Sequence, residues 1–181
     1  RVETAAIIAA YNFAPCGRVI DVGGGNGSFL SGVMTGCEQL SAVLFDQSAA
    51  IEAAQAGRGG PLPRCEFVAG NFFEFVPSGG DTYILKRVLD DWPDERVLLI
   101  LQNCRKAMKS GRRLLVIEPL MGRPNEMTPG HFADMNFLVT FKGGRIRTEQ
   151  EHFKLLGHAG FRLEKTLPTD SEVTVLEAFA V

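Results

Sequence analysis

The chain has 181 residues, 45% of them hydrophobic and 22% charged, and its formal net charge at pH 7 is -2. This length and composition are typical of a globular protein with one core, so residues 1–181 are interpreted as a single domain. The charge balance argues against a nucleic-acid partner held by phosphate contacts, and no apolar run is long enough to predict a membrane partner.

Along the chain, short apolar segments alternate with segments of helical periodicity, which predicts an α/β fold with a mostly parallel sheet and helices on both faces. Strands are expected at Arg18–Val22, Ala42–Phe45, Cys65–Ala69, Thr82–Leu85, Arg112–Glu118, Phe161–Thr166 and Glu172–Val181. Helices are expected at Glu3–Asn12, Ser28–Thr35, Ala49–Ala56, Asp94–Met108 and Thr148–Ala159. The last of these begins with a capping box, and a further apolar piece, Phe132–Phe141, is open to interpretation as a helix over the sheet edge.

The stretch VIDVGGGNGSF is the most informative part of the sequence, because an apolar strand runs directly into Gly23, Gly25 and Gly27 before a helix begins. Glycines let such a turn approach a ligand closely, and in an open α/β sheet the turn lies at the carboxyl ends of the strands, where ligands bind. The spacing is GxGxG instead of the GxGxxG of a dinucleotide loop, and Asp21 would repel a pyrophosphate. The loop therefore favours a cofactor with a cationic amino group, such as S-adenosylmethionine, over NAD.

Two later strand ends carry residues that suit the rest of that cofactor. Asp46 ends the second strand, where an acid can accept hydrogen bonds from both ribose hydroxyls. Asn71 follows the third strand and is expected to bond the adenine amino group, while Phe72 offers apolar or stacking area. The alternative is a structural role for all of them, but residues in register on successive strands favour a binding site.

Together these motifs resemble the class I S-adenosylmethionine-dependent methyltransferases. More narrowly, they resemble the catalytic domain of the small-molecule O-methyltransferases related to plant caffeic acid enzymes, hydroxyindole O-methyltransferase and bacterial polyketide methyltransferases. The similarity is carried by AAYNF, VIDVGGGNGSFL, GNFFE, YILKRVLDDWPDE, GRRLLVIEPL, and FKGGRIRT with EQEHFKLLGHAGF after it. The resemblance implies a Rossmann-like, seven-stranded sheet with a reversed last strand.

The resemblance also implies which residues contact the cofactor and the acceptor. Cofactor contacts are implied at Gly23, Asp46, Asn71, Phe72 and Lys86, to which Asp21, Gly25, Gly27 and Gln47 are added from the same strand ends. The implied acceptor is a small hydroxylated, aromatic compound of secondary metabolism, with contacts expected at Trp92, Met135 and Asn136. Family members usually carry an N-terminal helical domain that dimerises, so a homodimer is expected if such a domain precedes Arg1.

Two departures from the family pattern concern the catalytic base. The family's base is a histidine in an HDW triplet, and the triplet here is DDW, with Asp90 in that place. One of the two glutamates that orient the histidine is replaced by Ile146 in GGRIRT, while the other is retained as Glu118. Asp90 and Glu118 are therefore the candidate catalytic residues.

Three interpretations of Asp90 remain open. It is a substitute base, because burial beside Trp92 and a second carboxylate would raise its ordinary pKa of about 3.9. It is an inactive remnant in an enzyme that relies on proximity and desolvation alone, or that methylates an already ionised acceptor. Or it is a structural charge near a helix N-terminus. The leading hypothesis is an S-adenosylmethionine-dependent O-methyltransferase, and the alternative is a cofactor-binding relative that does not methylate.

The other chemically active residues are given structural roles. The four cysteines include no CxxC pair and no histidine at metal-ligand spacing, so no metal site is expected and reduced thiols in the cytoplasm are favoured. His152 and His158 fall on the expected helix Thr148–Ala159 and are interpreted as surface groups. His131, in the segment expected to face the acceptor, is left open to a role in binding.

Overall fold

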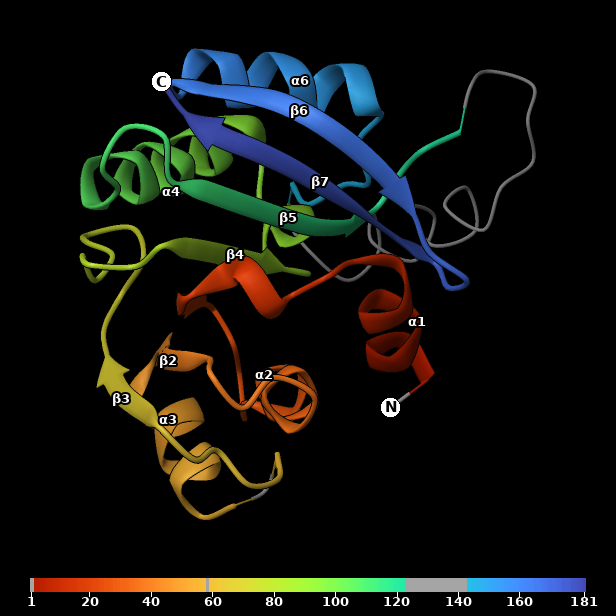
Figure 1. Ribbon diagram of the computed structural model, residues 1–181. Helices are drawn as coiled ribbons and strands as arrows, with labels where there is room; N and C mark the ends of the chain where they lie inside the picture. Colours follow the sequence, from red (N-terminus) through yellow and green to blue (C-terminus); the bar gives the residue numbers. More distant parts are fainter. Residues whose placement is uncertain (1, 58, 123–142) are drawn as a thin grey trace.

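The computed structural model describes residues 2–57, 59–122 and 143–181, and within them the chain forms a seven-stranded sheet of order β3-β2-β1-β4-β5-β7-β6 (Figure 1). The strands are β1 (Arg18–Val22), β2 (Ser41–Asp46), β3 (Cys65–Ala69), β4 (Thr82–Lys86), β5 (Arg113–Pro119), β6 (Phe161–Pro168) and β7 (Val173–Ala180). Strands β1 to β5 pair in parallel, and β7 runs antiparallel to both β5 and β6. The expected sheet with a reversed last strand is confirmed.

Helices cover both faces of the sheet and form two separate hydrophobic cores. The helices are α1 (Val2–Ala10), α2 (Ser28–Thr35), α3 (Ser48–Gln55), α4 (Asp94–Ala107) and α6 (Glu149–His158), with short 3-10 turns η1 (Ala14–Cys16) and η2 (Leu89–Asp91). Residues of α1, α2 and α3 share one core, and residues of α4 and α6 share the other (Figure 1). Val19 belongs to the first core and Ile20 to the second, because successive side chains of a strand point to opposite faces.

The element boundaries agree with the expected ones to within one or two residues. Helix Ser28–Thr35 and strands Arg18–Val22 and Cys65–Ala69 have the predicted bounds. The first helix ends before the predicted Asn12, because the Asn12 side chain accepts a hydrogen bond from Ala14 N–H and turns the chain. The capping box of Thr148 is formed. The piece Phe132–Phe141 lies outside the described residues.

The central strands are buried along almost their whole length, whereas in the edge strand β6 only Phe161 is buried and the other residues are partly or fully exposed. Because β1 to β5 run in parallel, their carboxyl ends lie along one edge of the sheet. Backbone hydrogen bonds connect the loops at this edge: Gly23 N–H donates to Phe45 O, and Arg87 N–H donates to Ile117 O. The candidate site therefore has a rigid base of five strand ends.

The four cysteines are free thiols. Within residues 2–57, 59–122 and 143–181, no group of His, Cys, Asp and Glu side chains is arranged to hold a metal ion. None of the helices described above has the length and apolar character that crossing a membrane requires.

Candidate active site

The glycine loop, residues 23–27, has the backbone conformation that its sequence predicts. Gly23, Gly25 and Gly27 have φ angles of +74°, +59° and +77°, a region that residues with a Cβ rarely adopt. A Cβ on Gly23 would lie 2.8 Å from Val88 Cγ2 and 3.6 Å from the Phe72 ring. Glycine is therefore required here both by the turn and by the close approach of Val88, which follows β4.

Asp46 fastens the glycine loop to the end of β2. Its Oδ2 accepts a hydrogen bond from Gly25 N–H at 2.8 Å, and its Oδ1 accepts one from Gln47 N–H at 2.6 Å. A carboxylate has about four acceptor positions, so Asp46 can hold the loop and still accept from the hydroxyls of a ligand. This arrangement fits the ribose contact expected from the sequence.

Asp21 lies behind the glycine loop and not in front of it. Its side chain is 1% exposed, and a Cβ on Gly24 would lie 2.5 Å from its Oδ2. That oxygen has no hydrogen-bond partner within the described part of the chain. Burial raises the pKa of Asp21 to about 7, the charge of Lys86 opposes the shift, and that of Asp46 adds to it. Its charge therefore faces the loop backbone from within the core.

The loops after β2 and β3 enclose a hollow of about 320 Å³, lined by Gln47, Gly70, Asn71, Phe72 and Phe73. An adjoining hollow of about 450 Å³ shares Gln47, Gly70 and Asn71. The structure thus brings together three of the residues expected to bind the cofactor, Gln47, Asn71 and Phe72. Asn71 is held by a local turn, in which its Oδ1 accepts from Phe73 N–H at 3.0 Å.

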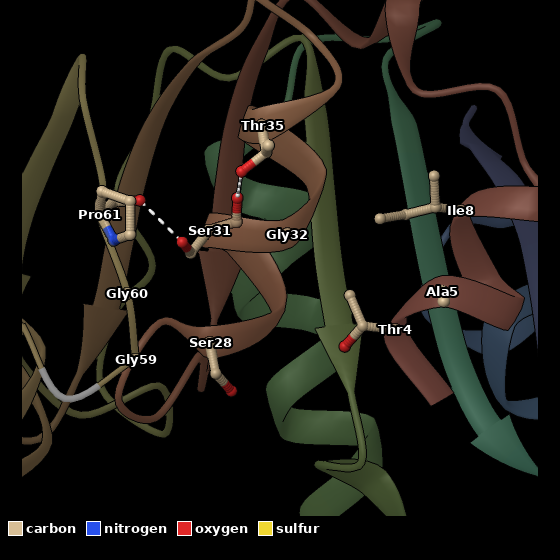
Figure 2. A pocket seen from close by; sticks show the side chains of 10 residues that line it. All are labelled: Thr4, Ala5, Ile8, Ser28, Ser31, Gly32, Thr35, Gly59, Gly60 and Pro61. Carbon is tan, nitrogen blue, oxygen red and sulfur yellow. Dashed lines mark hydrogen bonds between the residues drawn. The ribbon is translucent and has the colours of Figure 1, made fainter. Parts of the chain in front are cut away.

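Another hollow, of about 390 Å³, lies between α1, α2 and the loop at residues 59–61, and it contains no residue expected in the site (Figure 2). Ser31 Oγ donates to Pro61 O at 2.8 Å across it. Its lining, Thr4, Ala5, Ile8, Ser28, Ser31, Gly32, Thr35, Gly59, Gly60 and Pro61, carries hydroxyl groups but no charge. A Cβ on Gly59 would lie 2.0 Å from Asn26 O, so this loop supports the glycine loop from outside.

Lys86 and Trp92 are occupied by contacts within the protein. Lys86 Nζ lies 2.6 Å from Glu3 Oε1 of α1, and Arg87 donates to the other oxygen of Glu3. Trp92 packs edge-on against Phe73, with ring centroids 4.7 Å apart and an interplanar angle of 87°. The sequence predicts that Lys86 contacts the cofactor and that Trp92 contacts the acceptor. Each residue would have to make that contact in addition to its contact within the protein.

Two buried polar side chains hold the Asp90 turn, residues 88–92, from opposite sides. Glu118, near the end of β5, accepts from Val88 N–H at 3.0 Å and from Leu89 N–H at 2.9 Å, both through Oε1. Arg147, whose side chain is 0% exposed, donates to Leu89 O at 2.8 Å and to Trp92 O at 2.6 Å. The backbone on both sides of Asp90 is therefore fixed.

Asp90 and Glu118 are both buried, at 3% and 1% exposure. Burial raises the pKa of both carboxyls, and the charge of Asp90 adds to the shift at Glu118. The neighbouring Glu118 side chain and the positive charges of Arg87 and Arg147 oppose the shift at Asp90. Burial and the charge of Asp90 raise the pKa of the neighbouring Asp91 to about 6. The environment thus moves Asp90 toward the range in which a carboxylate becomes a useful base.

The segment GGRIRT supplies contacts that the sequence alone did not reveal. A Cβ on Gly144 would lie 2.6 Å from Asp90 O, so this glycine lets the segment pack against the turn. Arg147 belongs to the same motif. The motif was the only feature of the sequence that could have indicated a role for Arg147, because no sequence pattern distinguishes a buried arginine from a surface one. Ile146, in the place of the family's second glutamate, is 3% exposed.

One further expectation has a definite outcome. The interpretation of His152 as a surface group is wrong: it is 2% exposed, and burial lowers its pKa to about 4. It lies one helical turn before Leu156, on the buried side of α6. Met135, Asn136 and His131 lie outside the described residues.

Known proteins resemble this chain in both sequence and structure. Residues 1–162 match the family model described as an O-methyltransferase domain. Phenazine O-methyltransferase PhzM of Lysobacter antibioticus is 39% identical over 175 residues, which are 96% of this chain and 51% of that protein. The crystal structure of LaPhzM superposes with a TM-score of 0.91 at 38% identity, covering 98% of this chain and 54% of that one.

A solved structure with ligands is also similar. It is the O-methyltransferase NcsB1 from neocarzinostatin biosynthesis, in complex with S-adenosylmethionine and 2-hydroxy-5-methyl naphthoic acid. It has a TM-score of 0.85 and 35% identity, covering 98% of this chain and 53% of that one. The present chain spans about half the length of these relatives.

Proposed function

The chain belongs to the O-methyltransferase family whose domain it matches over residues 1–162, and from that premise we propose that it transfers a methyl group from S-adenosylmethionine to a hydroxyl of a small aromatic metabolite. The observation that carries the proposal is the glycine loop fastened by Asp46 beside the hollow of Gln47, Asn71 and Phe72. The naphthoic acid and cofactor of the NcsB1 structure support the same chemical class of ligands.

The residues at the strand ends suit the three parts of this cofactor. Asp46 would accept from the ribose hydroxyls, and Asn71 with Phe72 would contact the adenine. The backbone of Gly23, Gly25 and Gly27 would lie against the methionyl part, with the charge of Asp21 behind it. The bound cofactor supplies a methyl group on a positively charged sulfur, which any nucleophilic oxygen in line with it can attack.

We assign the proton transfer to Asp90. A phenol is a poor nucleophile until its proton leaves, and a positioned base typically contributes about 10²–10⁴-fold to the rate. Asp90 has the raised pKa that this task needs, and the hydrogen bonds of Glu118 and Arg147 fix the backbone of its turn. The acceptor's O–H bond breaks, its electron pair remains on oxygen, and the proton moves to Asp90.

Residues 1–181 are proposed to act as a single catalytic domain, supported by the one continuous sheet among the described residues. A homodimer is proposed, on the family resemblance alone, for a protein in which an N-terminal helical domain precedes Arg1. Light scattering of such a protein measures it, and a monomer at micromolar concentration would contradict it.

Calorimetry with S-adenosylhomocysteine tests the binding site. Asp46→Ala should weaken binding strongly, because it removes both the ribose acceptor and the anchor of Gly25. Asp170→Ala, a control at an exposed position in the β6–β7 loop, should bind like the unmodified protein. The absence of measurable binding in the unmodified protein would overturn the proposal.

Product analysis tests the reaction itself. The protein is incubated with S-adenosylmethionine and a panel of phenols that includes 1,4-dihydroxy-2-naphthoic acid, and the products are analysed by mass spectrometry. A mass increase of one methyl group supports the proposal. Cofactor binding without methylation of any acceptor would contradict it and favour the alternative of a non-methylating relative.

A further inference from the structure

Asp90 and Glu118 bring two buried carboxyls together from different elements, the η2 turn and strand β5. Oε1 of Glu118 is occupied by the two N–H groups of Val88 and Leu89. Its Oε2 and Oδ1 of Asp90 lack a donor among the residues that the structure describes. Two ionised carboxylates in this position would repel each other and leave two acceptors unpaired, whereas one proton between them removes both difficulties.

We propose that Asp90 and Glu118 hold one proton between them at neutral pH: the proton is bonded to Glu118, which donates a hydrogen bond to the ionised Asp90. The two side chains then form a single proton-accepting unit for the reaction. The second half of this inference rests on the proposed function, while the first half does not. Asp90 is the catalytic residue of the unit, because it would take the proton of the acceptor. Glu118 is a positioning residue that acts through Asp90.

The surrounding charges decide which carboxyl carries the proton. Arg87 after β4 and Arg147 before α6 face Asp90 and favour its ionised form, while Asp91 is the like charge beside it. Glu118 has no such cation among the groups that shift it: burial and then the charge of Asp90 raise its pKa, and the N–H groups of Leu89 and Val88 only partly oppose them. Asp90 is thus the ionised member and Glu118 the neutral one.

A proton on Glu118 explains both departures from the family pattern, Asp90 in place of the histidine and Ile146 in place of a glutamate. The family's histidine is a neutral base that becomes a cation, so glutamates around it are favourable. Asp90 is an anionic base that becomes neutral, so a second ionised glutamate nearby would add repulsion. An apolar residue, Ile146, occupies the place of that glutamate in the segment that packs against the turn. The remaining glutamate, Glu118, is compatible because it carries a proton.

Infrared spectroscopy of the unmodified protein tests the shared proton without a substrate. Protein labelled with ¹³C in the glutamate carboxyls should show the band of a protonated glutamic acid at pH 7, shifted by the label. The band should be absent from Glu118→Gln and retained in Glu164→Gln, which changes an exposed glutamate of β6. Absence of the band from the unmodified protein at pH 7 would overturn the proposal.

The pH dependence of unfolding gives an independent measurement. The folded-state pKa of Glu118 lies above its ordinary value of 4.5, so its contribution to stability is complete below that pH and is lost as the pH rises. Relative to Glu118→Gln, the folding equilibrium constant of the unmodified protein should fall about tenfold per pH unit above this value until Glu118 itself ionises. Parallel pH profiles of the two proteins in urea unfolding would contradict the proposal.

The turnover of two Glu118 variants tests the role of the proton pair in the proposed reaction. Glu118→Gln keeps both the acceptor for Val88 and Leu89 and a neutral donor toward Asp90, so it should turn over at least about tenfold faster than Glu118→Ala, a difference of one hydrogen bond. Equal loss in both variants would overturn the neutral role of Glu118. If the glutamic acid band is present and no methylated product forms, only the proposed function is contradicted. If a methylated product forms and the band is absent, only the proton pair is contradicted.

Discussion

The glycine loop and the Asp90 turn lie at neighbouring strand ends, yet different physics holds each of them. The glycine loop depends on missing side chains: positive φ angles, a close approach to Val88, and the N–H of Gly25, which donates to the half-buried acid Asp46. The Asp90 turn depends on two buried polar side chains, Glu118 and Arg147, which bind its N–H and C=O groups. A loop built from backbone can contact a ligand, whereas a turn held by buried polar side chains can keep one carboxyl at a shifted pKa.

This difference predicts that changes in the Asp90 turn reduce turnover or stability and leave cofactor affinity largely unchanged. Asp90→Asn gives the largest expected effect, a loss of turnover of about 10²–10⁴-fold, because the amide cannot accept the acceptor's proton. Initial rates measure the loss, and calorimetry with S-adenosylhomocysteine should show similar affinity. Asp91→Asn, in the same turn, should lose less. An unchanged rate in Asp90→Asn would remove this residue from the mechanism.

Arg145 and Arg147 both pair with Asp94, and a comparison of the two tests whether the buried arginine holds the turn. Arg147→Met leaves Leu89 O and Trp92 O without their donor and should reduce the free energy of unfolding by about 2–6 kcal/mol, about 1–3 kcal/mol for each carbonyl. Arg145→Met removes partly exposed ion pairs with Asp94 and Glu151 and should cost about 1 kcal/mol or less. Urea unfolding of both variants measures the difference. Equal effects would mean that the turn does not depend on its buried arginine.

A glycine outside the cofactor loop tests the same turn through steric contact. Gly144→Ala places a Cβ 2.6 Å from Asp90 O and should destabilise the protein by about 1–3 kcal/mol. Turnover should fall with it, because the backbone of Asp90 must move, while affinity for S-adenosylhomocysteine is retained. Gly157→Ala in α6 meets nothing within 4 Å and should be neutral or slightly stabilising. A large loss of cofactor affinity in Gly144→Ala would show that the two regions are not separate.

The acid behind the glycine loop, Asp21, predicts a change in stability that depends on pH. The folded-state pKa of Asp21 is about 7, above its ordinary value of 3.8, so its contribution to stability is complete below pH 4 and is lost as the pH rises to about 7. The unmodified protein should therefore lose about 1.4 kcal/mol per pH unit relative to Asp21→Asn across this range. Urea unfolding at several pH values measures the slope. Parallel curves would contradict the buried position of Asp21.

The glycine loop could be predicted from the sequence almost completely, and the Asp90 turn only in part. A GxGxG turn after an apolar strand needs positive φ angles wherever it occurs, and Asp46 follows at the next strand end. The turn depends on Glu118 and Arg147, which stand about 30 and 60 residues further along the chain, at separations where hydrophobic periodicity carries no information. The same reason explains His152, whose burial follows from the face of α6 that packs on the sheet.

The sequence by itself determined the order of strands and helices, the turn that needs glycine, and the type of cofactor the strand ends suit, because each depends on neighbouring residues. Only the tertiary structure decided that Asp21 lies behind the loop and that Lys86 pairs with Glu3. It also decided that Asp90 lies beside Glu118, in a turn whose backbone a buried arginine binds. The cost of burying a charge depends on what surrounds it in space, so the pKa values of these acids are properties of the fold.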